Sequence, residues 1–184
     1  MKPIHLIPLA NGAGSAAPPG LDLLEHVAAS LARHFRTPCR IRPELFDVGF
    51  AADTGRGQYY STAILQRLES RAEGGVRILG VTVHDLYVPV LTFVFGEAQL
   101  DGPCAVVSTA RLDDRFYGLP ANEGLLRERL VKEAVHELGH TFGLRHCPDW
   151  QCVMASSHAV ERLDIKNADF CADCRKPIDG ERYW

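Results

Sequence analysis

One string of residues near the end of the chain constrains its fold more than any other feature. It runs His136-Glu137-Leu138-Gly139-His140-Thr141-Phe142-Gly143-Leu144-Arg145-His146. Residues four apart in an α-helix are offset by about 40° around the axis and about 6 Å along it, so His136 and His140 project from one face. A continuous helix would carry His146 about 15 Å along the axis from His136, so the helix has to end between them. Gly143 can take the left-handed backbone angles that commonly follow a helix end, which would bring His146 back.

The three histidines of this string predict a catalytic zinc site. Three neutral imidazoles leave one position of the ion open to water. Glu137 lies about 100° around the helix from His136, beside such a metal rather than among its ligands. We therefore expect Glu137 to act as a general base toward the attacking water. The alternative is a set of unrelated surface and core histidines, which leaves the spacing of Gly143 and His146 unexplained.

Four cysteines follow in two short-spaced pairs, Cys147 with Cys152 and Cys171 with Cys174. Two such pairs separated by a loop match a tetrahedral zinc site that four thiolates close to water. We expect a second, structural zinc here, and because Cys147 adjoins His146 we expect this zinc to fix the third histidine in place. Disulfide bonds are the alternative.

The two other cysteines, Cys39 and Cys104, have no close partner in the sequence. A free cysteine usually behaves as a small apolar residue, and we expect both to be buried, reduced thiols.

Length, composition and charge argue against nucleic-acid partners, membrane association and secretion. With 184 residues and 46% apolar content, the chain can bury a sizeable core as one domain. A net charge of -3 without runs of like charge argues against nucleic-acid and membrane-surface partners. No apolar stretch approaches the roughly 20 residues of a membrane span. Residues 1–10, broken by His5 and Pro8, are more typical of a strand than of a signal peptide, so we expect a cytoplasmic protein. We also expect a monomer.

Hydrophobic periodicity predicts an α/β order of elements. The continuous apolar run 76–83 is typical of a central strand covered on both faces. A helix over 125–142 carries the first two histidines, with its apolar residues spaced to face the sheet. The other predicted elements are strands at 4–9, 39–46, 91–95 and 104–108 and helices at about 21–35 and 60–68.

Regular patterning fades after residue 144, so the rest of the chain must be held by something other than a large core. We expect a single domain, 1–184, made of two parts. Residues 1–143 form the sheet and helices, including the zinc-binding helix, and 144–184 form a loop-rich C-terminal subdomain.

The combined order of the three histidines, Cys147, Cys152, Met154 and the final cysteine pair resembles the archaemetzincin family of metzincin zinc peptidases. The resemblance covers residues 133–174 and is specific in combination. It implies a metzincin-like α/β (α+β) fold, with a twisted mixed sheet, an active-site helix and a zinc-stapled C-terminal part. It also implies that Met154 forms a turn beneath the catalytic metal and that residues 91–95 border the substrate cleft.

The resemblance further implies two zinc ions per chain and a peptide or protein substrate. The ligands would be His136, His140 and His146 for the catalytic ion and Cys147, Cys152, Cys171 and Cys174 for the structural ion.

Two function classes remain open from the sequence. The first is a zinc-dependent peptidase, and the second is a two-zinc peptide-binding or interaction module with weak or vestigial peptidase activity. The presence of Glu137 favours hydrolysis, because a structural site has no use for a general base. Nucleic-acid binding through the cysteine-rich tail lacks the basic, aromatic-interleaved surface it would need. His158 could line the cleft, but we assign it no ligand role.

Overall fold

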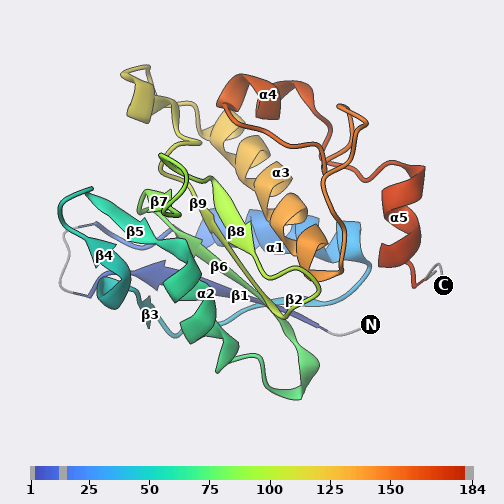
Figure 1. Cartoon of the computed structure of the whole chain (residues 1–184), viewed down its shortest axis with the longest axis horizontal. Helices are drawn as coiled ribbons and strands as arrows, with labels where there is room; N and C mark the ends of the chain where they lie inside the picture. Colours follow the sequence, from blue (N-terminus) through green and yellow to red (C-terminus); the bar gives the residue numbers. More distant parts are fainter. Residues whose placement is uncertain (1–2, 13–15, 181–184) are drawn as a thin grey trace.

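A six-stranded mixed sheet lies at the centre of the fold (Figure 1). The computed structural model describes residues 3–12 and 16–180. The strand order is β2-β1-β6-β9-β8, with β3 also paired to β1, and every pairing is parallel except that of β8 with β9. The strands are β1 (Ile4–Ala10), β2 (Cys39–Ile41), β3 (Phe46–Asp47), β6 (Arg77–Thr82), β8 (Gly96–Ala98) and β9 (Cys104–Ser108).

The predicted central strand is confirmed, because β6 lies between β1 and β9 and is buried along nearly its whole length. Its residues alternate between two cores. Leu79 and Val81 pack with helices α1 (Leu21–Phe35) and α3 (Glu123–Thr141), whereas Ile78 packs with α2 (Ser61–Glu69). Successive side chains of a strand point to opposite faces, so the sheet separates α1 and α3 from α2.

A second, three-stranded sheet has the order β4-β5-β7. Its strands are β4 (Ala52–Asp53), β5 (Gln58–Tyr60) and β7 (Leu86–Tyr87). Elsewhere in the chain, short 3₁₀ turns lie at Gly49–Ala51, Glu73–Gly75 and Asp114–Tyr117. Within the described ranges, no helix is both long and apolar enough to cross a membrane.

Helix α3 starts two residues before the predicted position, with the Asn122 side chain accepting a hydrogen bond from the Leu125 amide at its N-cap. The helix is buried on more than its predicted apolar face, because Arg129, Lys132 and Glu133 on the polar side are also buried. The C-terminal segment covers that side of the helix (Figure 1). Arg129, for example, forms ion pairs with both Asp114 and Asp164.

Up to residue 180, the C-terminal part contains two short helices that periodicity did not predict, α4 (Val160–Ile165) and α5 (Ala172–Ile178). Each is too short to show a helical repeat. Both contribute buried apolar side chains to the core beside α3, namely Leu163 and Ile178. The tail therefore adds to the main core more than its sequence indicated.

Two predicted strands differ from those in the structure. The segment 39–46 splits into β2 and β3 on either side of Pro43, which cannot donate to a sheet.

The segment 91–95 does not form a strand and makes only an isolated bridge, between Val94 and Leu86. The carbonyls of Leu91 and Thr92 accept hydrogen bonds from the side chains of Arg56 and Gln58 instead of from a neighbouring strand. The edge strand of the main sheet is β8, which begins one residue after this segment.

Candidate active site

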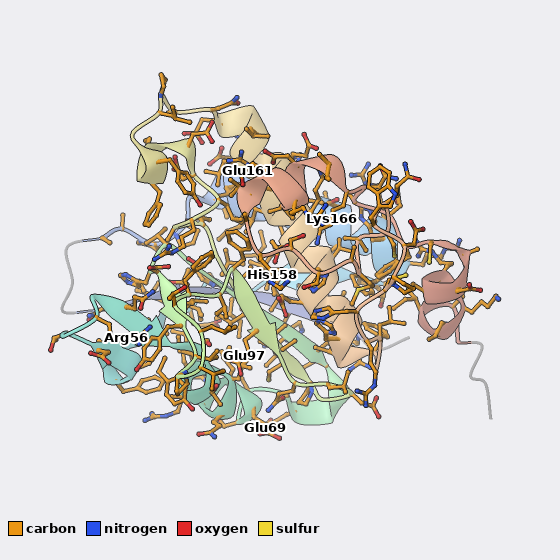
Figure 2. All side chains as sticks on the ribbon, turned by 45° about the horizontal axis from the view of Figure 1, so that its top comes forward. Arg56, Glu69, Glu97, His158, Glu161 and Lys166 are labelled. Atoms are coloured by element: carbon orange, nitrogen blue, oxygen red, sulfur yellow. The ribbon has the colours of Figure 1, made fainter. Side chains whose placement is uncertain are left out.

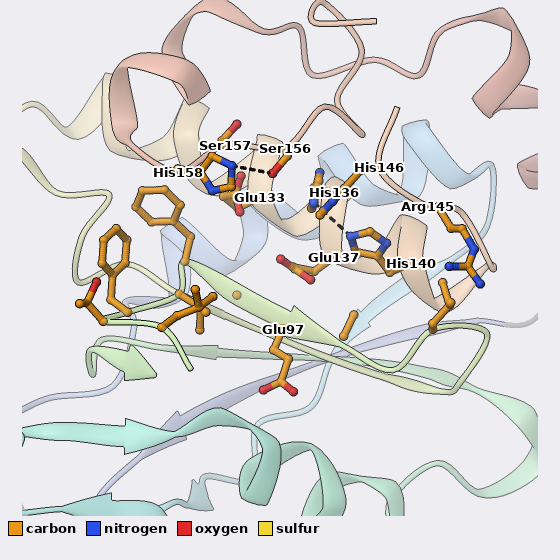
Figure 3. A pocket seen from close by; sticks show the side chains of 18 residues that line it. Glu97, Glu133, His136, Glu137, His140, Arg145, His146, Ser156, Ser157 and His158 are labelled. Carbon is orange, nitrogen blue, oxygen red and sulfur yellow. Dashed lines mark hydrogen bonds between the residues drawn. The ribbon is translucent and has the colours of Figure 1, made fainter. Parts of the chain in front are cut away.

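A cleft of about 560 Å³ opens between α3 and the edge strand β8 (Figure 3). One wall is formed by Glu133, His136, Glu137 and His140 of α3, and the other by residues 91–98. Residues 156–158 close one end and Arg145 and His146 the other. The cleft therefore draws on both parts of the chain, and the segment 91–95 lines it although it is not a strand.

The structure brings together all three histidines of the string. Their ring nitrogens lie within 4.8 Å of one another, and the Nε2 atoms of His136 and His140 are 3.1 Å apart. The helix ends before His146 in a Schellman turn: Gly143 has φ of +86°, its amide donates to the His140 carbonyl, and the Leu144 amide donates to the Gly139 carbonyl. This reversal carries His146 back to the other two rings.

Two of these rings have a fixed tautomer. Nδ1 of His136 lies 2.8 Å from the Val153 carbonyl oxygen, and Nδ1 of His140 lies 2.7 Å from that of Leu144. A carbonyl only accepts, so each Nδ1 carries the proton and donates it, and each Nε2 keeps a lone pair. Burial lowers the pKa of His136 well below its ordinary value and lowers those of His140 and His146 as well. All three imidazoles are thus held in the neutral form that binds metals.

The donor set fits a zinc ion. Tetrahedral zinc with Zn–N distances of about 2.0–2.1 Å separates its nitrogen ligands by about 3.3 Å. The 3.1 Å between the two Nε2 atoms is close to that value, and without a shared cation two facing lone pairs would repel.

Glu137 lies on the same helix, buried against the edge strand. Burial, and then repulsion from Glu133, raise the pKa of Glu137 well above its ordinary value. Gly96 of β8 allows this close approach, because a Cβ atom there would lie 2.7 Å from both Glu137 Cγ and the Val106 carbonyl oxygen. Sequence reasoning missed Gly96, since nothing local to it indicates that a distant helix passes alongside.

Met154 is fully buried under the helix that carries the histidines. A Cβ atom on Gly139 would lie 2.5 Å from its sulfur and 3.3 Å from the Phe170 ring, so the motif's internal glycine makes room for the methionine. The Met154 carbonyl accepts a hydrogen bond from the Cys147 amide. The turn at Met154 is therefore tied both to α3 and to the residue that follows His146.

The four clustered cysteines also come together, with their Sγ atoms within 4.8 Å of one another. Cys147 Sγ and Cys171 Sγ are 3.8 Å apart, far longer than the disulfide length of about 2.05 Å, and all four thiols are free. Tetrahedral zinc with Zn–S distances of about 2.3 Å separates its sulfurs by about 3.8 Å, so this set fits zinc. Cys152 Sγ also accepts hydrogen bonds from the amides of Met154 and Cys171, which stabilise a thiolate.

Cys39 and Cys104 lie on β2 and β9, outside this cluster. Both are free, Cys104 is buried and Cys39 half-buried, and burial raises the pKa of each to about 12. They remain protonated thiols at neutral pH.

His158 lines the cleft but is exposed, and its ring lies 3.4 Å from the Ser156 hydroxyl (Figure 3). It does not belong to either cluster. Glu133 and its partner Lys166 were also missed by sequence reasoning, because a pair 33 residues apart leaves no local pattern.

Comparison with known proteins agrees with this geometry. The model of peptidase family M54 matches residues 53–180. Among the relatives, the archaemetzincin of Methanocaldococcus jannaschii is 43% identical over 140 residues, 76% of either chain. That of Archaeoglobus fulgidus is 41% identical over 157 residues, which cover 84% of this chain and 90% of the relative.

Solved structures are similar over almost the whole chain. The archaemetzincin crystal structure from Methanopyrus kandleri has a TM-score of 0.82 and 34% identity, covering 98% of this chain and 94% of that one. A zinc-dependent peptidase from Methanocorpusculum labreanum has a TM-score of 0.82 and 30% identity, covering 95% and 99% respectively. These matches confirm the predicted family and fold class. The chain belongs to peptidase family M54, the archaemetzincins, and is a zinc metallopeptidase.

Proposed function

We propose that this peptidase cuts its substrate at the end of α3, where His136, His140 and His146 hold the catalytic zinc. One observation carries the proposal. The Nε2 atoms of His136 and His140 face each other at 3.1 Å while both Nδ1 protons are donated to carbonyls. Carbonyl partners of this kind orient metal-binding histidines in other proteins. The third ring approaches from beyond Gly143, which leaves the cleft side of the site open to water and substrate.

When bound, the zinc lowers the pKa of a coordinated water to about 7 and polarises the scissile carbonyl. Glu137 is the group that moves protons. Its carboxylate accepts a proton from the attacking water and donates it to the nitrogen of the leaving amine. The close packing against Gly96 holds this carboxylate in one place beside the histidines.

We further propose that Cys147, Cys152, Cys171 and Cys174 hold a structural zinc. Four thiolates leave no position for water, so this ion has no part in hydrolysis. Gly143 and Met154 support the catalytic site, the first by reversing the chain and the second by packing under Gly139. In this proposal residues 1–184 form one domain, with 144–184 as a C-terminal subdomain stapled by the second zinc.

The substrate is a peptide or protein chain that lies along β8. Among the residues that the structure describes, this strand pairs only with β9, and it faces the cleft with its other edge. An extended peptide can add to such an edge as a further strand, which places its backbone opposite Glu137.

We also propose a reducing, cytoplasmic location and a monomer that binds neither nucleic acid nor membrane. All six cysteines are free thiols, which suits a compartment that keeps thiols reduced. The chain's net charge of -3 does not favour polyanions.

Cleavage of a diverse peptide library tests the proposed function. The zinc-loaded protein is expected to cut a subset of peptides, to lose this activity when a chelator removes zinc, and to regain it when zinc is restored. Mass spectrometry of the products gives the cut positions. A protein that holds both zinc ions and binds peptides without cutting them would instead be an interaction module.

A further inference from the structure

A buried ion pair lies beside the proposed zinc site and takes no part in the mechanism above. Glu133 Oε1 and Lys166 Nζ are 3.3 Å apart, and the two side chains are 5% and 1% exposed. Glu133 belongs to α3, and Lys166 follows directly after α4 (Figure 2). Burying two charges costs free energy that a single ion pair rarely returns in full, so such a pair is weak grounds for stability alone.

Glu133 is placed to act on the metal site. It precedes His136 by three residues and Glu137 by four, so it lies on the same face of α3, about 4.5 Å along the axis from His136. It also lines the cleft (Figure 3). Glu133 thus lies between the proposed catalytic residues and the end of the cleft at residues 156–158.

Lys166 has a second task in the structure. Its Nζ also donates a hydrogen bond of 3.2 Å to the carbonyl of Ala155, the residue after Met154. The ammonium group thereby joins the turn beneath the site to α3. A neutral side chain could not bind a carboxylate and a carbonyl in this way with equal strength.

The cost of this link is a positive charge close to the histidines. The field of the Lys166 ammonium group reaches the cleft wall that Glu133 shares with His136 and His140, because the ammonium nitrogen lies 3.3 Å from the Glu133 carboxylate. The same field would oppose a zinc ion at these rings. Of the ion pairs in the described part of the chain, Lys166 takes part only in the one with Glu133.

We propose that Glu133 is a positioning residue that neutralises Lys166, so that this buried lysine can fasten the Met154 turn to α3 without repelling the catalytic zinc. The proposal rests on the three-histidine zinc site proposed above. It assigns Glu133 no contact with substrate or metal.

The variant E133Q separates charge from shape. Glutamine keeps the size of the side chain and an oxygen that accepts from Lys166, but it removes the negative charge that pairs with the lysine. Zinc alone is titrated into protein whose cysteine site is already loaded, in competition with a chromophoric chelator. We expect at least a 10-fold loss of zinc affinity at the histidine site. Adding K166M to E133Q removes the unpaired charge together with the link to Ala155, so the affinity should recover to within about fivefold of the unmodified protein, the remaining loss being that of the link.

A matched control is available on the same helix. Glu128 Oε1 lies 2.7 Å from the nitrogen of a second buried lysine, Lys132. That nitrogen also donates to the carbonyls of Leu163 and Asp164, and Lys132 does not line the cleft. E128Q therefore removes a carboxylate partner from a buried lysine without placing a net charge at the site, and its zinc affinity should not change.

Three results would overturn the proposal: full zinc affinity in E133Q, no recovery in the double variant E133Q/K166M, or an equal loss in E128Q. If E133Q does not fold, E133L/K166M replaces the pair by apolar side chains and should bind zinc within about fivefold of the unmodified protein; weaker binding would also refute the idea. Failure of the unmodified protein to bind zinc at the histidines would count against the proposed function instead.

Discussion

Replacing Glu137 by glutamine is expected to lower kcat by about 10³-fold while both zinc ions stay bound. General acid–base catalysis contributes about 10²–10⁴-fold, and an amide can neither accept the proton of water nor return it to the amine. Glutamine has almost the same volume, so the packing against Gly96 and the orientation of the three rings should be preserved. The measurement is kcat and KM with the best library peptide, together with zinc content per chain.

Glu128→Gln is the control for this prediction, since it makes the same chemical change on the same helix at a position eight residues before His136. It should cleave at close to the normal rate. If Glu137→Gln also cleaved normally with zinc bound, Glu137 would have no role as the base.

Cys171→Ser is expected to damage both metal sites. A structural zinc contributes several kcal/mol or more to folding, because the site exists only in the folded chain. Loss of one thiolate should therefore lower the Tm markedly and release the second zinc. We also expect the histidine site to bind zinc at least 10-fold more weakly than in the unmodified protein, although Cys171 is not part of that site.

The reason for this coupling is the segment between Cys147 and Met154. Cys147 adjoins His146 and its amide donates to the Met154 carbonyl, while the Val153 carbonyl accepts the Nδ1 proton of His136. Two of the three rings thus depend on a segment whose shape the cysteines fix.

Cys39→Ser is the matched control, because it changes a free thiol that lies outside the cluster. It should leave both zinc affinities unchanged. A Cys171→Ser protein that binds zinc at the histidines with full affinity would show that the two sites are independent.

Both clusters could be predicted from the sequence because their residues follow one another at short, recognisable spacings. The helical repeat places His136 and His140 on one face, and Gly143 lies at the position where the helix has to end. The cysteine pairs are short-spaced in the same way. The central strand β6 could be predicted as well, since a strand buried on both faces has a continuous apolar run in its sequence.

What the sequence could not predict depends on partners far along the chain. Residues 91–95 have the composition of a strand, but Arg56 and Gln58 occupy the carbonyls of Leu91 and Thr92. Lys166 is a polar residue in a loop until the fold buries it against Glu133. Such contacts follow from tertiary packing, which local propensity does not encode.

An anomalous-difference map from crystals of the zinc-loaded protein, recorded at the zinc absorption edge, tests the central claim most directly. We predict two peaks. One should lie about 2.1 Å from a ring nitrogen of each of His136, His140 and His146, with solvent or substrate at a fourth position. The other should lie about 2.3 Å from the four Sγ atoms. A first peak that lacks His146, or that has the Glu137 carboxylate among its ligands, would contradict the proposed site.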